Sequence, residues 1–182
     1  MSQCLRGRPK GSVGRAAIFG PADLTKILRT VRMSKNYAGR AEVAFLLSVE
    51  LGLLAGELSL LRVGDLYNAC GLVRMQSPIG LADMRSASST LRAALSAYWE
   101  RHLAGSHRSS PLFRSQRGNG LSRGSLARLL TTLYREAGIS TASSRSGRRT
   151  ADSDEAGHAF QSEAGRYSEL MPARYSDAKP AT

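Results

Sequence analysis

Cysteine and long apolar runs are scarce in this 182-residue chain. The two cysteines, Cys4 and Cys70, lie far apart and form no CxxC pair, which excludes a cysteine-rich zinc site and favours reduced thiols. The longest apolar stretch, 43–54, is interrupted by Ser48 and Glu50 and is too short to span a bilayer. The N-terminus lacks the apolar segment of a secretory signal. We therefore expect a soluble protein of a cytoplasm-like compartment, with no metal centre.

Acidic residues and lysines are also few. Lysine and arginine together number 26 against 14 aspartates and glutamates, which leaves a formal net charge of +12, and only four of the basic residues are lysines. This excess favours polyanionic partners, with DNA or RNA first and acidic membrane surfaces second. The alternative is a compositional bias towards arginine. Hydrophobic residues make up 42% of the chain, which at this length is enough for one domain with a core.

Residues 1–18 predict a flexible basic arm, because they are rich in glycine and arginine and have no hydrophobic period. Within the arm, RGRPKG resembles the core of an AT-hook. The proline would hold the backbone extended, so that Arg6, Arg8 and Lys10 reach into a narrow minor groove. A solvated tail without a DNA contact is the alternative.

The rest of the chain predicts an α+β domain that is mainly helical, with a small β-hairpin or sheet. Apolar periodicity and capping residues indicate helices at 21–33, 39–54 and 55–66, a helix capped by Ser88 or Ser89, and a helix at about 122–137 that Gly138 ends. The hairpin is expected from 72–76 and 80–86, which Pro78 and Gly80 divide.

Residues 141–182 contain few aliphatic side chains, so this tail is expected to be functional, eroded or poorly ordered. It includes SSRSGRRT at 143–150, where three arginines fall within five positions. Arginine forms forked contacts with phosphate, which makes the cluster a candidate DNA contact. Upstream, Glu57 is expected to be an internal hydrogen-bond or ion-pair partner, and Trp99 a core residue.

Taken in order, these segments resemble the catalytic domain of the tyrosine recombinases, the phage-integrase family, over roughly residues 19–182. LGLLAGELSLLRVGDL at 51–66 is similar to the family's Gly-Leu-Arg-x-x-Glu-Leu motif. SSRSGRRT is similar to its His-x-x-Arg box, AGH at 156–158 to its Gly-His motif, and ARYSDAKP at 173–180 to the segment around its nucleophilic tyrosine. The family's N-terminal core-binding domain has no counterpart in this sequence.

The resemblance implies DNA integration and recombination on a mobile genetic element, with duplex DNA and other recombinase protomers as partners. In this family a tyrosine attacks a phosphodiester and forms a 3′-phosphotyrosyl link. Arginines and histidine neutralise the charge that develops on phosphorus. Because the covalent link conserves the energy of the broken bond, neither a metal nor another cofactor is needed.

The family's site residues fall on this sequence only in part. Its second arginine matches Arg148 and its Gly-His histidine matches His158, whereas Leu54 stands in place of the first arginine and Arg145 in place of the box histidine. The hairpin lysine has no match. Arg149 is interpreted as a backbone-phosphate contact or a solvated side chain, and Arg145 is a candidate DNA contact.

The resemblance leaves two candidates for the nucleophile, Tyr167 and Tyr175. Tyr167 follows His158 at the family's interval, whereas Tyr175 lies in the better-matching local sequence and is slightly favoured. Because so many site positions differ, we expect a recombinase that is weakened or inactive. A non-enzymatic DNA-binding or regulatory protein on the same scaffold is the alternative, and a relic without a selected role is a third.

Overall fold

The computed structural model of the chain describes residues 16–34, 38–74 and 87–153. The expectation of a mainly helical domain is confirmed in this part of the chain. The helices are α1 (Pro21–Met33), α2 (Ala38–Glu50), α3 (Ala55–Leu60), α4 (Val63–Leu66), α5 (Ser89–Tyr98), the π-helical η1 (Trp99–Leu103), α6 (Arg123–Glu136) and α7 (Ser146–Ala151).

The extended structure of the described residues is limited to isolated antiparallel bridges, Arg62 with Pro111, Tyr67 with Val73 and Arg114 with Gly120. Most of the expected hairpin, 75–86, lies outside the described residues, as do residues 1–15 of the expected basic arm. The bridge between Tyr67 and Val73 closes a tight turn instead, in which Asn68 Oδ1 accepts hydrogen bonds from the backbone N–H groups of Cys70 and Leu72, each at 2.9 Å.

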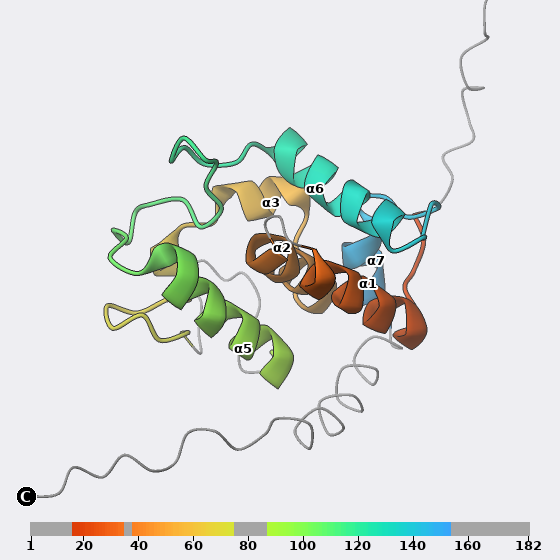
Figure 1. Ribbon diagram of the computed structural model, residues 1–182, viewed down its shortest axis with the longest axis horizontal. Helices are drawn as coiled ribbons and strands as arrows, with labels where there is room; N and C mark the ends of the chain where they lie inside the picture. Colours follow the sequence, from red (N-terminus) through yellow and green to blue (C-terminus); the bar gives the residue numbers. More distant parts are fainter. Residues whose placement is uncertain (1–15, 35–37, 75–86, 154–182) are drawn as a thin grey trace, which may run out of the picture.

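Helix α2 is the centre of the fold. Every residue from Val43 to Val49 is buried, because the sequence there is apolar on nearly all sides of the helix. Helices α1, α3, α5, α6 and α7 all contact it. In Figure 1, α2 lies in the middle of the described helices, with α5 below it and α6 above.

The outer helices follow the apolar pattern and the capping residues of the sequence. Helix α1 buries Leu24, Ile27, Leu28 and Val31. Helix α6 begins where Ser122 Oγ accepts a hydrogen bond from the backbone N–H of Ser125. It ends at Glu136, and Gly138, whose φ of 77° suits glycine, turns the chain away two residues later. An aromatic contact joins α6 to the start of the domain, since the rings of Phe19 and Tyr134 lie 4.9 Å apart.

A half-buried carboxylate links the end of α2 to the start of α5. Ser88 caps α5, as one of the two expected serines, by accepting a hydrogen bond from Leu91 N at 3.0 Å. Glu50 in turn accepts hydrogen bonds from Ser88 N at 2.9 Å and from Ser88 Oγ at 2.7 Å. Burial raises the pKa of the Glu50 carboxyl above its ordinary value of 4.5, and the two hydrogen bonds from Ser88 act in the opposite direction.

We expect Glu50→Gln to make the protein's stability less dependent on pH. The folded carboxyl binds its proton more tightly than the unfolded one, so its stabilising contribution is complete below the ordinary pKa and is lost as the pH rises through the raised value. Urea unfolding of both proteins between about pH 4 and pH 8 measures this difference. Relative to the variant, the wild type should lose stability as the pH rises. A difference that is constant, or that changes in the opposite direction, would contradict this account of Glu50.

Candidate nucleic-acid interface

The arginine cluster at 143–150 forms a helix that packs on the core. Helix α7 buries Ser146, Gly147 and Thr150 and leaves Arg148 exposed. At the start of the helix, Ser146 Oγ accepts a hydrogen bond of 3.0 Å from the backbone N–H of Ser143, which precedes the helix. The part of the expected tail that the structure describes, 141–153, is therefore packed, whereas 154–182 lies outside the described residues.

Helix α7 approaches α2 at a glycine. A Cβ atom on Gly147 would lie 2.2 Å from Ser48 Oγ and 2.8 Å from Ser48 Cβ, far inside normal contact distances. Ser48 is completely buried in α2, and its hydroxyl has no hydrogen-bond partner among the described residues. The pair of small residues thus sets how closely the helix that carries Arg148 approaches the core.

The buried side of α7 also contacts the beginning of the domain. Thr150 Oγ1 accepts a hydrogen bond from the backbone N–H of Phe19 at 2.9 Å and donates one to the carbonyl of Ser146, also at 2.9 Å. Beside it, one terminal nitrogen of Arg149 donates to the carbonyl of Ala16. Arg149, expected as a phosphate contact, therefore has one of its donors engaged within the protein.

Arg148 lies between two carboxylates. Its side chain is 46% exposed, with Nη1 3.5 Å from Glu57 Oε1 and Nε 3.9 Å from Asp152 Oδ2. The second oxygen of Glu57 accepts a hydrogen bond from the backbone N–H of Leu54 at 2.6 Å. The expectation that Glu57 is an internal hydrogen-bond and ion-pair partner is confirmed.

Two of the expected site positions are brought together in this way. Leu54 precedes α3 and Arg148 lies on α7, yet the carboxylate of Glu57 contacts both residues. The chain at Gly52 is close as well, because a Cβ there would lie 3.9 Å from Cγ of Arg148. Arg145 precedes α7 and is exposed, and its backbone N–H donates to Ser143 Oγ at 3.3 Å. The remaining candidates, His158, Tyr167, Tyr175, Arg6, Arg8 and Lys10, lie outside the described residues.

The tyrosines of the described residues are buried and poorly suited to nucleophilic attack. Burial raises the pKa of Tyr98 to about 12, although Arg40 and then Arg114 act against this shift. The pKa values of Tyr67 and Tyr134 are also raised by burial. A phenol must lose its proton to attack phosphorus, and burial opposes the charged form. A nucleophilic tyrosine of this chain would therefore have to be one other than Tyr67, Tyr98 and Tyr134.

Sequence reasoning missed the structural use of two arginines next to Tyr98. Arg40 donates a hydrogen bond to the carbonyl of Arg114 at 2.6 Å, and Arg114 Nε donates to the carbonyl of Pro111 at 3.4 Å. The nearby phenol of Tyr98 donates to the carbonyl of Leu112 at 3.1 Å. Nothing in the local sequence distinguishes these arginines from surface ones. The carbonyl that Arg40 contacts is 74 residues away in the chain, and the carbonyl that Arg114 contacts is a nearby one that carries no sequence signal.

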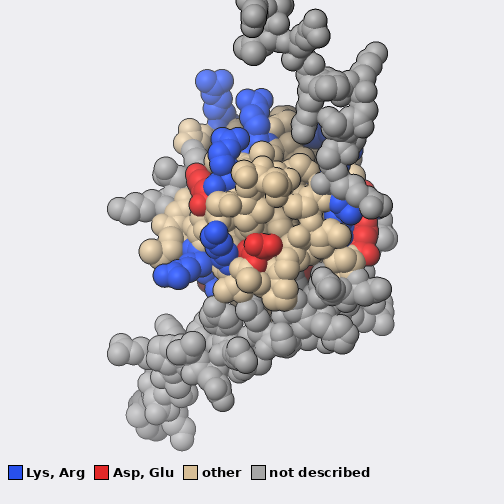
Figure 2. Space-filling view, turned by 90° about the vertical axis from the view of Figure 1, so that its right-hand side faces the viewer, with Lys and Arg blue, Asp and Glu red and all other residues tan. Residues whose placement is uncertain are grey.

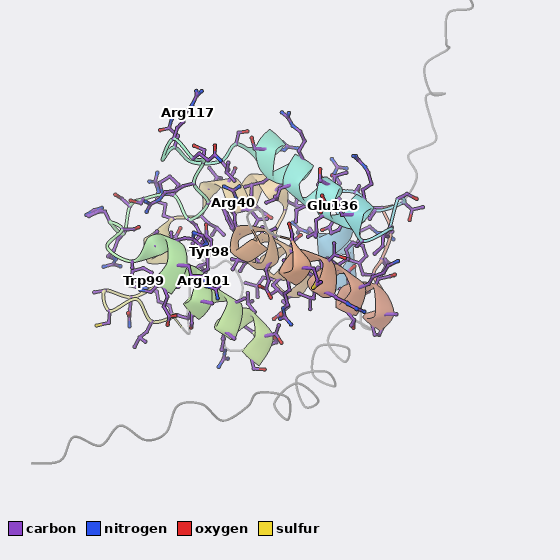
Figure 3. The ribbon with its side chains drawn as sticks, viewed as in Figure 1. Arg40, Tyr98, Trp99, Arg101, Arg117 and Glu136 are labelled. Carbon is purple, nitrogen blue, oxygen red and sulfur yellow. The ribbon has the colours of Figure 1, made fainter. Side chains whose placement is uncertain are left out.

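Other arginines extend into solvent. Arg117 lies in the turn between Arg114 and Gly120 and points away from the helical body in Figure 3. Arg128 and Arg135 are exposed on α6 and lie on one face, two turns apart. Figure 2 shows basic side chains on several parts of one face, with fewer acidic side chains among them.

We expect Gly147→Ala to destabilise the protein by about 1 to 3 kcal/mol, because the added methyl group overpacks the contact with Ser48. Adding Ser48→Ala removes the nearest atom and should restore part of the loss. Urea unfolding followed by circular dichroism measures each change. Gly124→Ala is the matched control, since Gly124 is exposed on α6 and its nearest contact would be 3.9 Å away. Equal effects at the two glycines, or no coupling between Ser48 and Gly147, would show that α7 is not held at this distance.

Among the described residues no helix has both the length and the apolar character needed to cross a membrane. The same residues contain no group of three or more histidine, cysteine, aspartate or glutamate side chains that could hold a metal ion. Comparison of the chain with known protein families, with curated proteins and with solved structures yields no match. The resemblance to tyrosine recombinases therefore stays a prediction from the sequence motifs.

Proposed function

We propose that this chain is a DNA-binding protein related to the tyrosine recombinases, with a role in DNA integration and recombination and a weakened or inactive catalytic site. The observation that carries the proposal is the meeting of two motifs at one carboxylate. Glu57 comes from the first motif and Arg148 from the arginine box, and their side chains form an ion pair although the residues are far apart in sequence. In the family that the motifs resemble, both segments serve the same phosphate.

The chemistry of Arg148 suits a DNA phosphate. Its backbone is held in a helix that packs against the core, and its guanidinium is half-exposed, so that N–H donors remain accessible to a ligand. The charge of the whole chain, +12, favours the approach of any nucleic acid. Contacts of this kind position the protein on a duplex and carry little sequence information.

The neighbouring position explains why catalysis should be weak. Leu54 has no charge to stabilise a transferring phosphoryl group. By analogy with the arginine fingers of GTPases, the missing arginine corresponds to a rate loss of roughly 10³- to 10⁵-fold. The same aliphatic residue supports a second candidate function, a non-enzymatic DNA-binding or regulatory protein. The two candidates share the phosphate contact at Arg148 and differ only in whether a tyrosine reacts.

We expect duplex DNA to bind with steep salt dependence, because several arginines displace counterions from the phosphates. Fluorescence anisotropy at increasing salt should give a log–log slope of about −4 or steeper. Arg148→Gln should weaken binding to all sequences and make the slope shallower by about one. Arg101→Gln is the control, an exposed arginine of η1, and should have a smaller effect. Binding that is absent at low salt, or unaffected by salt, would refute the proposal.

We expect no covalent DNA adduct from the unmodified chain on nicked suicide substrates, because Leu54 and Arg145 replace charged or proton-transferring groups of the family. Leu54→Arg combined with Arg145→His restores two of these groups and should produce a denaturation-resistant adduct. Tyr175→Phe or Tyr167→Phe in that background should abolish the adduct, and the effective change identifies the nucleophile. Efficient cleavage by the unmodified chain would mean that another group replaces the missing arginine.

A further inference from the structure

The two carboxylates beside Arg148 are held very differently. Glu57 is 38% exposed, and the hydrogen bond of 2.6 Å from Leu54 N fixes one of its oxygens at the start of α3. Asp152 is 68% exposed, and Arg148 is the one ion-pair partner of its carboxylate within the described part of the chain. The two residues of this pair are four positions apart at the end of α7. The carboxylate of Glu57 is therefore held in place, whereas the carboxylate of Asp152 can move away from Arg148 when its side chain rotates into water.

The two carboxylates also face different nitrogens of the guanidinium. Nη1 lies nearest to Glu57 and Nε nearest to Asp152, at 3.5 Å and 3.9 Å. A phosphate that binds an arginine in the bidentate manner uses two donors on one edge of the fork. Any such contact that includes Nε must compete with Asp152, both for space and for the positive charge. The phosphate has the advantage in this competition, because an exposed ion pair at such a distance contributes little free energy.

We propose that Asp152 is a displaceable carboxylate that restrains Arg148 and weakens its contact with a DNA phosphate. This inference rests on the proposed function, since it concerns the same arginine. Glu57 keeps the guanidinium near Leu54, while Asp152 occupies Nε until a phosphate takes its place. The contact with Asp152 thus holds the arginine in place but lowers its affinity for a DNA phosphate. Removal of the Asp152 charge should remove this contact and raise the affinity.

The test measures the affinity of Asp152→Asn for a duplex at low salt. Asparagine keeps the size of the side chain and is well accepted at the end of a helix, so the fold should persist. Relief of an exposed ion pair corresponds to roughly a two- to five-fold gain in affinity. Glu100→Gln is the matched control, since it removes the same charge from an exposed residue of η1. It reports how much any lost negative charge improves binding. If Asp152→Asn unfolds, Asp152→Ser replaces it.

A double-mutant cycle with Arg148→Gln separates the restraint from a general charge effect. In that background the gain from Asp152→Asn should fall to the size of the Glu100→Gln gain, because the aspartate no longer has its arginine. Equal gains from Asp152→Asn and Glu100→Gln in the wild type would overturn the inference, as would a gain that persists without Arg148. Those outcomes leave the proposed function intact. Failure of every variant to bind DNA would refute the proposed function and the inference together.

Discussion

The fold depends on the burial of one apolar helix. From Val43 to Val49, α2 has no solvent-facing residue, so other elements must cover it on every side. The outer helices α1 and α6 do this with aliphatic side chains in the usual amphipathic pattern. Helix α7 instead contributes Ser146, Gly147 and Thr150, and it covers α2 because the glycine allows a very close approach. Its remaining surface is turned outward and carries Arg148.

This arrangement explains how a short polar helix can present a charged group in a fixed place. Thr150 connects α7 to the start of the domain, Gly147 to the centre, and Glu57 connects Arg148 to α3. Three parts of the chain thus meet at the short helix that carries Arg148. Leu54, whose backbone N–H donates to the other oxygen of Glu57, adds no charge of its own to this junction. In chemical terms the junction suits the binding of a phosphate better than the stabilisation of a reacting one.

Sequence patterns predicted the elements that depend on apolar periodicity and on caps. The helices at 21–33 and 122–137, the serine cap of α5 and the stop at Gly138 are present in the structure. The packing of α7 was not predictable in this way, because its buried residues are small and polar and no hydrophobic pattern marks them. The role of Glu50 also escaped prediction, since its hydrogen-bond partner, Ser88, lies far away in the chain. The ion pair between Glu57 and Arg148 was not predictable from local sequence either, because no local physical signal connects the two segments.

The central claim is that Arg148 contacts DNA phosphate directly. Its most direct test is a nuclear magnetic resonance titration of the arginine Nε–Hε signals with duplex DNA, with Arg148 assigned by substitution. The account predicts that the Arg148 signal shifts on DNA addition, by more than that of Arg101, and that added salt reverses the change. An Arg148 signal that stays in place while other arginine signals shift would show that DNA binds elsewhere, and would contradict the account.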